Sequence, residues 1–443
     1  MPLDGSPADG AARLVSPGGL ESQPDADAFT EPSAGITGQA PSRSAEPLRD
    51  GVTDKDAAPG LRARPPGAKA RGLPRLDAED RAALGLWAAA HAALFVLAWA
   101  AAWAFRTSVD HAPLTGGFEH WDAVLLRNVA QYGYFGAHST ANNIAFFPGY
   151  PVTLAAAHLI LRNWVLSELT VSAVAGCFAV VSLARLANGR RAVLYLLTTP
   201  AAVFLMIGYA EALFLALAIP AWHAATRGRW WRAAALAGLA GLVRPDALFL
   251  IPALAVLALV QPAGSPASQE PRSVERSRLA CAATMCCALA GPVAYEIYLK
   301  VSTGSWLAWS RAMQAGWDLH LSNPVQALKT TWWAAFKHAF GAGTAFEFQL
   351  ELGAMAVIVL ATIAFALSQR WPEAVYCGLA AVALGTSTWY QGCPRTLLVL
   401  FPVFVALARL SSRRPWIGYV YLSISAPLAV VLGMMFLSGQ WAG

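Results

Sequence analysis

Charged residues are scarce in this sequence. Asp, Glu, Lys and Arg make up 13% of the 443 residues, and the mean hydropathy is +0.46, whereas soluble domains carry about 25% charged residues. Half of the 26 acidic residues precede Arg81, so the rest of the chain is poorer still in negative charge. This composition excludes an ordinary soluble enzyme and predicts a polytopic membrane protein.

The short motifs of several enzyme classes are also missing. The sequence has no P-loop, no HExxH zinc motif and no GxSxG nucleophile elbow. The Asp-x-Asp spacing of metal-dependent nucleotide-sugar transferases occurs only at residues 25–27 and 54–56, near the N-terminus, and the six cysteines show no metal-ligand spacing. We therefore expect no metal and no cofactor. We attribute the net charge of +6 to cationic membrane loops and expect no nucleic-acid partner.

The N-terminal residues 1–80 differ in composition from the rest. They are rich in Ala, Gly, Pro, Ser and Asp and nearly free of aromatic residues, so they bury too little apolar surface to offset the entropy of ordering. We expect a disordered cytoplasmic tail, followed by a membrane-embedded domain at residues 81–443.

Apolar runs in that domain predict an all-α bundle of eleven transmembrane helices. The expected spans are 82–105, 167–184, 192–207, 212–225, 233–243, 247–260, 279–298, 350–367, 374–389, 396–408 and 416–437. Placing the arginine-rich loops inside leaves two long extracytoplasmic loops, 106–150 and 300–349, and a cytoplasmic linker at 261–278. The apolar run 150–161 is too short to cross, so we expect a re-entrant or interfacial helix; if it crosses, every later orientation inverts.

The first outer loop contains an amphipathic pattern. Its apolar positions recur at i, i+4, i+8 and i+11: Trp121, Leu125, Val129 and Tyr132. This spacing predicts a helix on the outer membrane surface that ends at Gly133. Asp122 lies in the first turn, where the helix dipole favours an ionised carboxylate. On this pattern alone, Asp122 is equally well interpreted as a capping residue.

This expected topology places three further charged residues, Glu211, Arg244 and Arg395, at the same outer membrane face as Asp122. Each alone is more simply a charge at a helix end. Together they suggest a site at the outer membrane boundary, with Asp122 as a base that takes a proton and Arg244 or Arg395 as holders of a lipid-linked phosphate. Sugar transfer from a lipid phosphate needs these parts.

Several motifs, taken in order, resemble the bacterial relatives of PIG-V, the transferase that adds the second mannose of the glycosylphosphatidylinositol anchor. They are His120-Trp121-Asp122, QYGY at 131–134, AFFPGYP at 145–151, YAEALF at 209–214, Arg244-Pro245, WSRAMQAGW at 309–317, Pro394-Arg395 and Phe401-Pro402. The resemblance implies a GT-C glycosyltransferase that uses polyprenyl-phosphate mannose, inverts the anomeric centre and needs no metal. It matches Asp122 to the loop aspartate that acts as base.

The sequence departs from the family pattern at Gly149, Asp246 and Thr396. Asp246 matters most, because a carboxylate beside Arg244 weakens that arginine as a phosphate holder. Arg311 and Arg395 then become the stronger candidates for binding the phosphate. The full set of expected substrate-binding residues is His120, Trp121, Tyr150, Glu211, Arg244, Arg311, Gln314, Trp317 and Arg395. Trp309 and Trp317 either anchor the loop at headgroup depth or stack on sugar faces.

We therefore expect a multi-pass protein of a bacterial cytoplasmic membrane, with its N-terminus in the cytoplasm and its active site outside. The expected reaction moves mannose from polyprenyl-phosphate mannose to a hydroxyl of a glycolipid, glycan or protein. Two alternatives remain open at this point: the same enzyme class with another polyprenyl-phosphate sugar, and a transporter of lipid or solute whose helices are broken at prolines.

Overall fold

The computed structural model describes residues 76–105, 116–136, 138–261, 271–337 and 341–440. Of the expected disordered tail, residues 1–80, only residues 76–80 lie within these ranges. The first described helix begins at Ala78, three residues before the expected end of the tail. The described residues fold into helices, and an isolated bridge between Leu321 and Ser387 is the β-structure found among them. The all-α class expected from the composition is confirmed for this part of the chain.

Among the described residues, five helices are long and apolar enough to cross a membrane. They are α1 (Ala78–Phe105), α4 (Trp164–Ala187), the stretch Ser277–Thr303 formed by the end of α9 (Pro271–Cys286) and α10 (Ala290–Thr303), α13 (Ala342–Leu367) and α17 (Pro415–Leu437). A sixth span results if α15 (Cys393–Val399) and α16 (Phe401–Arg413), bent by 70°, are counted together. These spans confirm a polytopic membrane protein, whereas the count of eleven stays a prediction.

Shorter helices occupy several of the other expected spans. They are α6 (Glu211–Thr226), α7 (Trp230–Val243), α8 (Ala247–Val260) and α14 (Trp371–Gly385). At 1.5 Å per residue the 16 residues of α6 reach about 24 Å, less than the roughly 30 Å of a hydrocarbon core. The apolar run 150–161 likewise forms a short helix, α3 (Gly149–Leu161).

Two stretches expected as one segment are divided. The expected span 192–207 consists of a seven-residue helix, α5 (Arg191–Leu197), and a 3-10 helix, η3 (Pro200–Leu205). Pro200 supplies no backbone N–H, so an α-helix does not continue through it. The expected linker 261–278 is helical from Pro271, where α9 begins, and residues 262–270 lie outside the described ranges.

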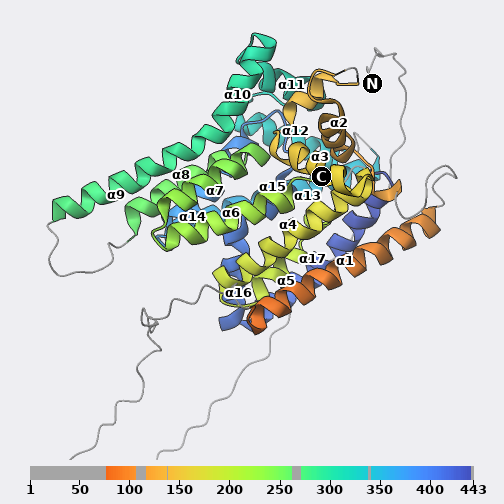
Figure 1. The fold of residues 1–443 in the computed structure, drawn as a ribbon. Coiled ribbons are helices and arrows are strands. Elements are labelled where there is room, and N and C mark those ends of the chain that lie inside the picture. Colours follow the sequence, from red (N-terminus) through yellow and green to blue (C-terminus); the bar gives the residue numbers. More distant parts are fainter. Residues whose placement is uncertain (1–75, 106–115, 137, 262–270, 338–340, 441–443) are drawn as a thin grey trace, which may run out of the picture. The chain divides into compact units, whose positions relative to one another are not determined.

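The core of the bundle is built around α6. This helix packs against α4 and α7, and ten of its residues are buried (Figure 1). Alanine and glycine allow the close approaches. A Cβ on Gly176 of α4 would meet the ring of Trp87 on α1, and a Cβ on Gly291 of α10 would meet the backbone of Gly238 on α7. Small residues at such crossings are typical of helix packing in membranes.

Large apolar side chains cover much of the outer surface of the spans. Trp103, Phe178, Leu360 and Tyr419 expose 76%, 64%, 64% and 71% of their surface. Apolar surface of this kind is unfavourable in water but fits the hydrocarbon of a bilayer.

The two expected outer loops contain helices of their own. The first includes α2 (Asp122–Tyr132) and the 3-10 helix η2 (Ala141–Ala145), and the second includes α11 (Ala308–Trp317) and α12 (Pro324–Phe336). Both α2 and α11 contact η2, near the top of the bundle in Figure 1. The two loops therefore meet at one end of the bundle.

Candidate functional site

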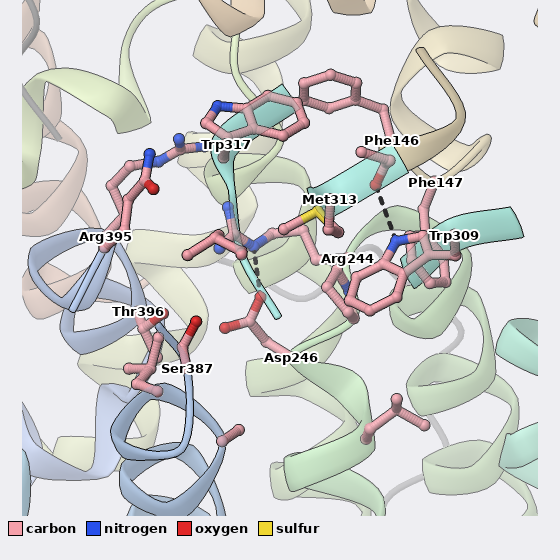
Figure 2. A pocket seen from close by; sticks show the side chains of 18 of the residues that line it. Phe146, Phe147, Arg244, Asp246, Trp309, Met313, Trp317, Ser387, Arg395 and Thr396 are labelled. Carbon is pink, nitrogen blue, oxygen red and sulfur yellow. Dashed lines mark hydrogen bonds and ion pairs between the residues drawn. The ribbon is translucent and has the colours of Figure 1, made fainter. Parts of the chain in front are cut away.

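A cavity of about 590 Å³ lies where the two outer loops meet the helix ends. Its walls come from the start of α2, residues 145–147 beside η2, the turn between α7 and α8, the inner face of α11, the end of α14 and the start of α15. In Figure 2, Arg395 lies on the left of the cavity, Trp309 on the right, and Trp317 and Phe146 across the top. The lining is mostly apolar, with charged groups gathered on one side.

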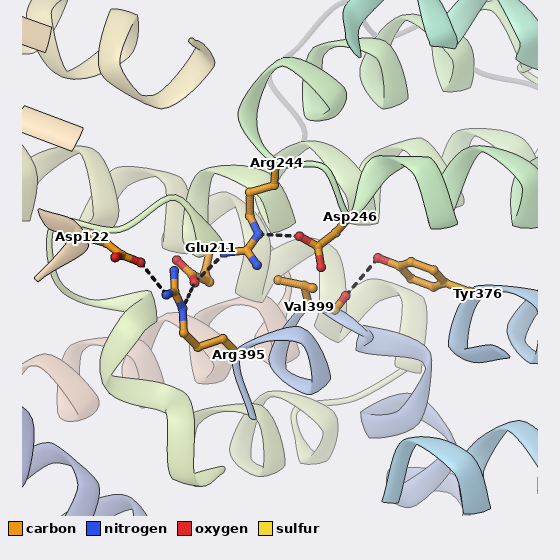
Figure 3. A network of polar contacts seen from close by, with 7 residues as sticks. All are labelled: Asp122, Glu211, Arg244, Asp246, Tyr376, Arg395 and Val399. Carbon is orange, nitrogen blue, oxygen red and sulfur yellow. Dashed lines mark hydrogen bonds and ion pairs between the residues drawn. The ribbon is translucent and has the colours of Figure 1, made fainter. Parts of the chain in front are cut away.

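Those charged groups form a continuous chain of ion pairs (Figure 3). Arg395 donates from Nη1 to Asp122 Oδ2 at 2.6 Å and from Nε to Glu211 Oε1 at 2.7 Å. The same Glu211 oxygen accepts from Arg244 Nη1 at 2.5 Å, and Arg244 Nε donates to Asp246 Oδ2 at 2.8 Å. Carboxylates and guanidiniums thus alternate along the chain, with an acid at each end and Glu211 in the middle.

The members of this series of ion pairs differ in how far they are exposed. The side chain of Glu211 is 0% exposed, whereas those of Arg244 and Arg395 are 13% and 15% exposed. Both arginines line the cavity together with Asp122 and Asp246, and Glu211 lies behind them. The Arg395 guanidinium also lies 5.1 Å from the ring centre of Phe204 and 4.8 Å from that of Tyr209, both cation–π contacts.

Arg395 is placed by the first turn of α15. Gly392, at φ 75°, turns the chain just before this helix. Glu351 of α13 accepts hydrogen bonds from the backbone N–H groups of Gly392 and Cys393, each at 2.8 Å. A buried carboxylate at a helix N-terminus satisfies donors that have no partner within the helix.

Arg244 and Asp246 are placed by the turn between α7 and α8. Arg244 ends α7 with an extended backbone, and Asp246 precedes the first residue of α8. The start of α3 approaches the end of α7 closely at Gly149, where a Cβ would lie 2.8 Å from Leu242 O and Val243 Cγ2. The glycine that departs from the family pattern is therefore required here by the space available beside Arg244.

Asp122 is placed by α2. The preceding residue, Trp121, has φ 55° and ψ −125°, a conformation that non-glycine residues rarely adopt and that tends to occur at functional sites. Farther along α2, Arg127 pairs with Glu168 of α4 at 2.8 Å and with Glu119 at 3.0 Å. These contacts seat α2 on the bundle and fix where its first turn lies.

The prediction of a helix that ends at Gly133 is confirmed, and Asp122 lies in its first turn. The place of this helix on the outer membrane surface stays a prediction. Asp122, Ala123, Leu126 and Val129 are buried, whereas Trp121 and Tyr132 are 44% and 40% exposed. The face of α2 that packs on the bundle is therefore the face that carries Asp122 and Leu126.

The aromatic end of the cavity is held by hydrogen bonds to the backbone. Trp309 Nε1 donates to Ala145 O at 3.1 Å, and Tyr134 Oη donates to Phe146 O at 2.8 Å. Burial raises the pKa of the Tyr134 phenol, which keeps it protonated as a donor. Trp317 meets Phe146 edge to face, with ring centres 5.8 Å apart. The rings of Phe146, Trp309 and Trp317 therefore present fixed apolar faces to the cavity.

The structure separates the expected site residues into five groups. Asp122, Arg244, Arg395 and Trp317 line the cavity, and Glu211 lies buried behind the arginines. The ring of His120 packs on Phe436 at 5.9 Å, and Trp121 Nε1 donates to Gln440 O at 3.3 Å, so both lie beside the cavity on the C-terminal segment. Tyr150 is buried in the core, outside the lining. Arg311 and Gln314 are exposed and also outside it.

Arg311 and Gln314 lie away from the cavity because of helix periodicity. The inner face of α11 presents Trp309, Met313 and Trp317, which are four residues apart. At about 100° per residue, position 311 lies roughly 160° from the middle of this face, whereas position 314 lies roughly 100° from it, beyond its edge. Arg311 is therefore no candidate for holding a phosphate in this cavity.

Sequence reasoning missed Glu168 and Glu351. Each is a buried acid within an apolar span, and such residues usually have a partner or a function, which was the available signal. Asp246 was expected only to weaken Arg244, and it does pair with it. Within the described ranges, no group of three or more His, Cys, Asp or Glu side chains is arranged to hold a metal ion.

The chain is similar in sequence to curated proteins named GPI alpha-1,6-mannosyltransferase 2. The rat and human proteins are each 34% identical over 153 residues, and the mouse protein is 33% identical over 153 residues. This part of the chain is therefore related to a mannosyltransferase. The match covers 30% of this chain and 30% of each relative's length. No family profile matches the chain. No solved structure matches it either.

Proposed function

We propose that the protein is a glycosyltransferase that moves mannose from polyprenyl-phosphate mannose to a hydroxyl of a lipid, glycan or protein acceptor. The observation that carries this proposal is that Asp122 pairs with Arg395 and lines the cavity together with Arg395 and Arg244, in a chain related to a mannosyltransferase. The proposal places the active site on the extracytoplasmic face of a bacterial membrane.

The reaction needs one bond made, one bond broken and one proton moved. The acceptor oxygen forms a bond to the anomeric carbon of mannose while the bond from that carbon to the phosphate oxygen breaks. The proton of the acceptor hydroxyl goes to Asp122, which makes the oxygen a better nucleophile. The polyprenyl phosphate leaves with its bonding electron pair, and Arg244 and Arg395 stabilise the charge that develops on it.

The position of Arg395 fits an inverting displacement. Inversion requires the base and the leaving group on opposite sides of the anomeric carbon. Asp122 contacts Arg395 through Nη1, and Glu211 contacts it through Nε. A phosphate bound farther along the series of ion pairs, towards Arg244, is separated from Asp122 by the width of the Arg395 guanidinium. The sugar and the acceptor oxygen then lie in the cavity across that gap.

The apolar lining fits the rest of such a substrate pair. Phe146, Trp309 and Trp317 present aromatic faces of the kind on which sugar rings stack. Leu248 and Phe249 of α8 and Leu384 of α14 line the side formed by membrane-facing helices. A hydrocarbon chain attached to the phosphate has apolar surface to follow there.

The proposal is tested by a donor panel. Membranes that contain the protein, and matched membranes that lack it, are given radiolabelled mannose, glucose or arabinose on polyprenyl phosphate. We expect transfer of mannose only where the protein is present, with inversion at the labelled sugar. Transfer of glucose or arabinose instead would replace the sugar in the proposal. No transfer from any donor would contradict the enzyme class.

A further inference from the structure

The arrangement of Glu211 behind two arginines points to a role that the reaction itself does not define. We infer that Glu211 is a positioning residue that holds Arg244 and Arg395 together as one clamp for a lipid-linked phosphate. This inference rests on the proposed function, because it deepens the description of the same cavity. Its ligand class is a phosphate monoester or diester that carries a polyprenyl chain.

The first observation is that one oxygen of Glu211 serves both guanidiniums. Glu211 Oε1 accepts from Arg244 Nη1 at 2.5 Å and from Arg395 Nε at 2.7 Å. Two guanidiniums repel each other, and a shared buried carboxylate offsets that repulsion. The side chain of Glu211 is 0% exposed and does not line the cavity, so it acts on a ligand only through the arginines.

The second observation concerns the donors that remain. Each guanidinium uses Nε and Nη1 for the chain of ion pairs. In the part of the chain that the structure describes, no hydrogen-bond partner is found for Nη2 of Arg244 or of Arg395. Both side chains reach the cavity. The clamp thus has one guanidinium nitrogen of each arginine left for an anion, which suits a phosphate with several acceptor oxygens.

The third observation is the charge of the cluster. With every group ionised, three carboxylates face two guanidiniums, which gives a net charge of −1 on Asp122, Glu211, Asp246, Arg244 and Arg395. If charge alone decided phosphate binding, removing any of these carboxylates would strengthen it. If Glu211 positions the arginines, removing its charge weakens binding, because Arg244 then turns fully to Asp246 and Arg395 to Asp122. The sign of the effect separates the two explanations.

The test measures binding of a polyprenyl monophosphate to the purified full-length protein in detergent, with the matching polyprenol as the control lipid. For Glu211→Gln we expect the Kd for the phosphate to rise by about 10-fold to 100-fold, the loss of a charged hydrogen-bonded pair. Binding of the polyprenol should not change, since general damage to the cavity would affect both lipids alike.

Two further variants keep the test independent of whether Glu211→Gln folds. Glu211→Asp retains the charge but is one methylene shorter, so it cannot serve both arginines, and we expect weaker phosphate binding. Asp246→Asn removes an equal charge from the end of the series of ion pairs and frees Arg244. We therefore expect polyprenyl phosphate to bind more tightly, by up to about 10-fold.

Three outcomes would overturn the inference. Unchanged or tighter phosphate binding by Glu211→Gln would show that Glu211 acts only as a competing charge. Equally weaker binding by Asp246→Asn would show that loss of any carboxylate of the cluster weakens binding, so that Glu211 has no positioning role of its own. If the wild-type protein binds the polyprenol and the phosphate equally well, the cavity has no phosphate site, and the donor class of the proposed function fails as well.

Discussion

Replacing Glu351 tests how the site is held without touching the cavity. Each carboxylate oxygen of Glu351 accepts one backbone N–H, from Gly392 and from Cys393, and the residue is 5% exposed. Glu351→Gln turns one acceptor into an NH₂ donor that faces an N–H donor. A charge-assisted hydrogen bond contributes about 1.5–3 kcal/mol, so we expect the free energy of unfolding to fall by about that amount. Ala would remove both bonds, about 3–6 kcal/mol, a large part of a typical total stability.

The same change should affect binding because Arg395 lies in the first turn of α15, two residues after Cys393. We expect Glu351→Gln to weaken binding of polyprenyl phosphate by several-fold and to lower the temperature of unfolding in detergent. Glu347→Gln is the matched control, since Glu347 lies one turn earlier on α13 and makes no hydrogen bond to the turn before α15 within the described residues. Equal effects of the two variants, or no effect of Glu351→Gln, would refute the reasoning.

Three other variants test parts of the account. Gly208→Ala would place a Cβ 2.9 Å from the Glu168 carboxylate, so we expect the free energy of unfolding to fall by about 1–3 kcal/mol. Gly385 has open space around it, so Gly385→Ala should leave the free energy of unfolding unchanged, and an equal fall in both variants would contradict the packing argument. Arg311→Ala should leave sugar transfer unchanged, because Arg311 lies outside the cavity; a loss of transfer would return it to the site. Trp309→Phe keeps an aromatic ring but loses the hydrogen bond to Ala145 O, so we expect the free energy of unfolding to fall by about 0.5–1.5 kcal/mol. An unchanged melting temperature would show that this hydrogen bond does not contribute to stability.

The sequence predicted the parts of the fold that depend on local patterns. The apolar runs at 82–105 and 416–437, each longer than 20 residues, became the helices α1 and α17. The i, i+4 pattern and Gly133 predicted α2 and its end. Where the runs were short or contained proline, as at Pro200, length alone could not tell one span from a short helix followed by a 3-10 helix.

The site was predictable only in part, because its contacts join residues far apart in the chain. Asp122 was selected from its place in the first turn of a loop helix and from the family resemblance, and Glu211, Arg244 and Arg395 were selected as charges at the ends of apolar spans. The structure brings these four residues together. The sequence could not show that Glu211 lies behind the arginines, since burial depends on how α6 packs. An acid within an apolar run marks Glu351 as unusual, but the sequence could not identify its partners, which are backbone groups 41 and 42 residues later.

The central claim, that Asp122 is the base of a glycosyl transfer, is tested most directly by one measurement. Transfer of radiolabelled mannose from polyprenyl-phosphate mannose is compared in membranes with equal amounts of the wild-type protein and of Asp122→Asn. Asn keeps the size of the side chain but cannot take a proton, so the account predicts transfer slower by about 10²–10⁴-fold with polyprenyl phosphate still bound. Equal transfer by both proteins would contradict it.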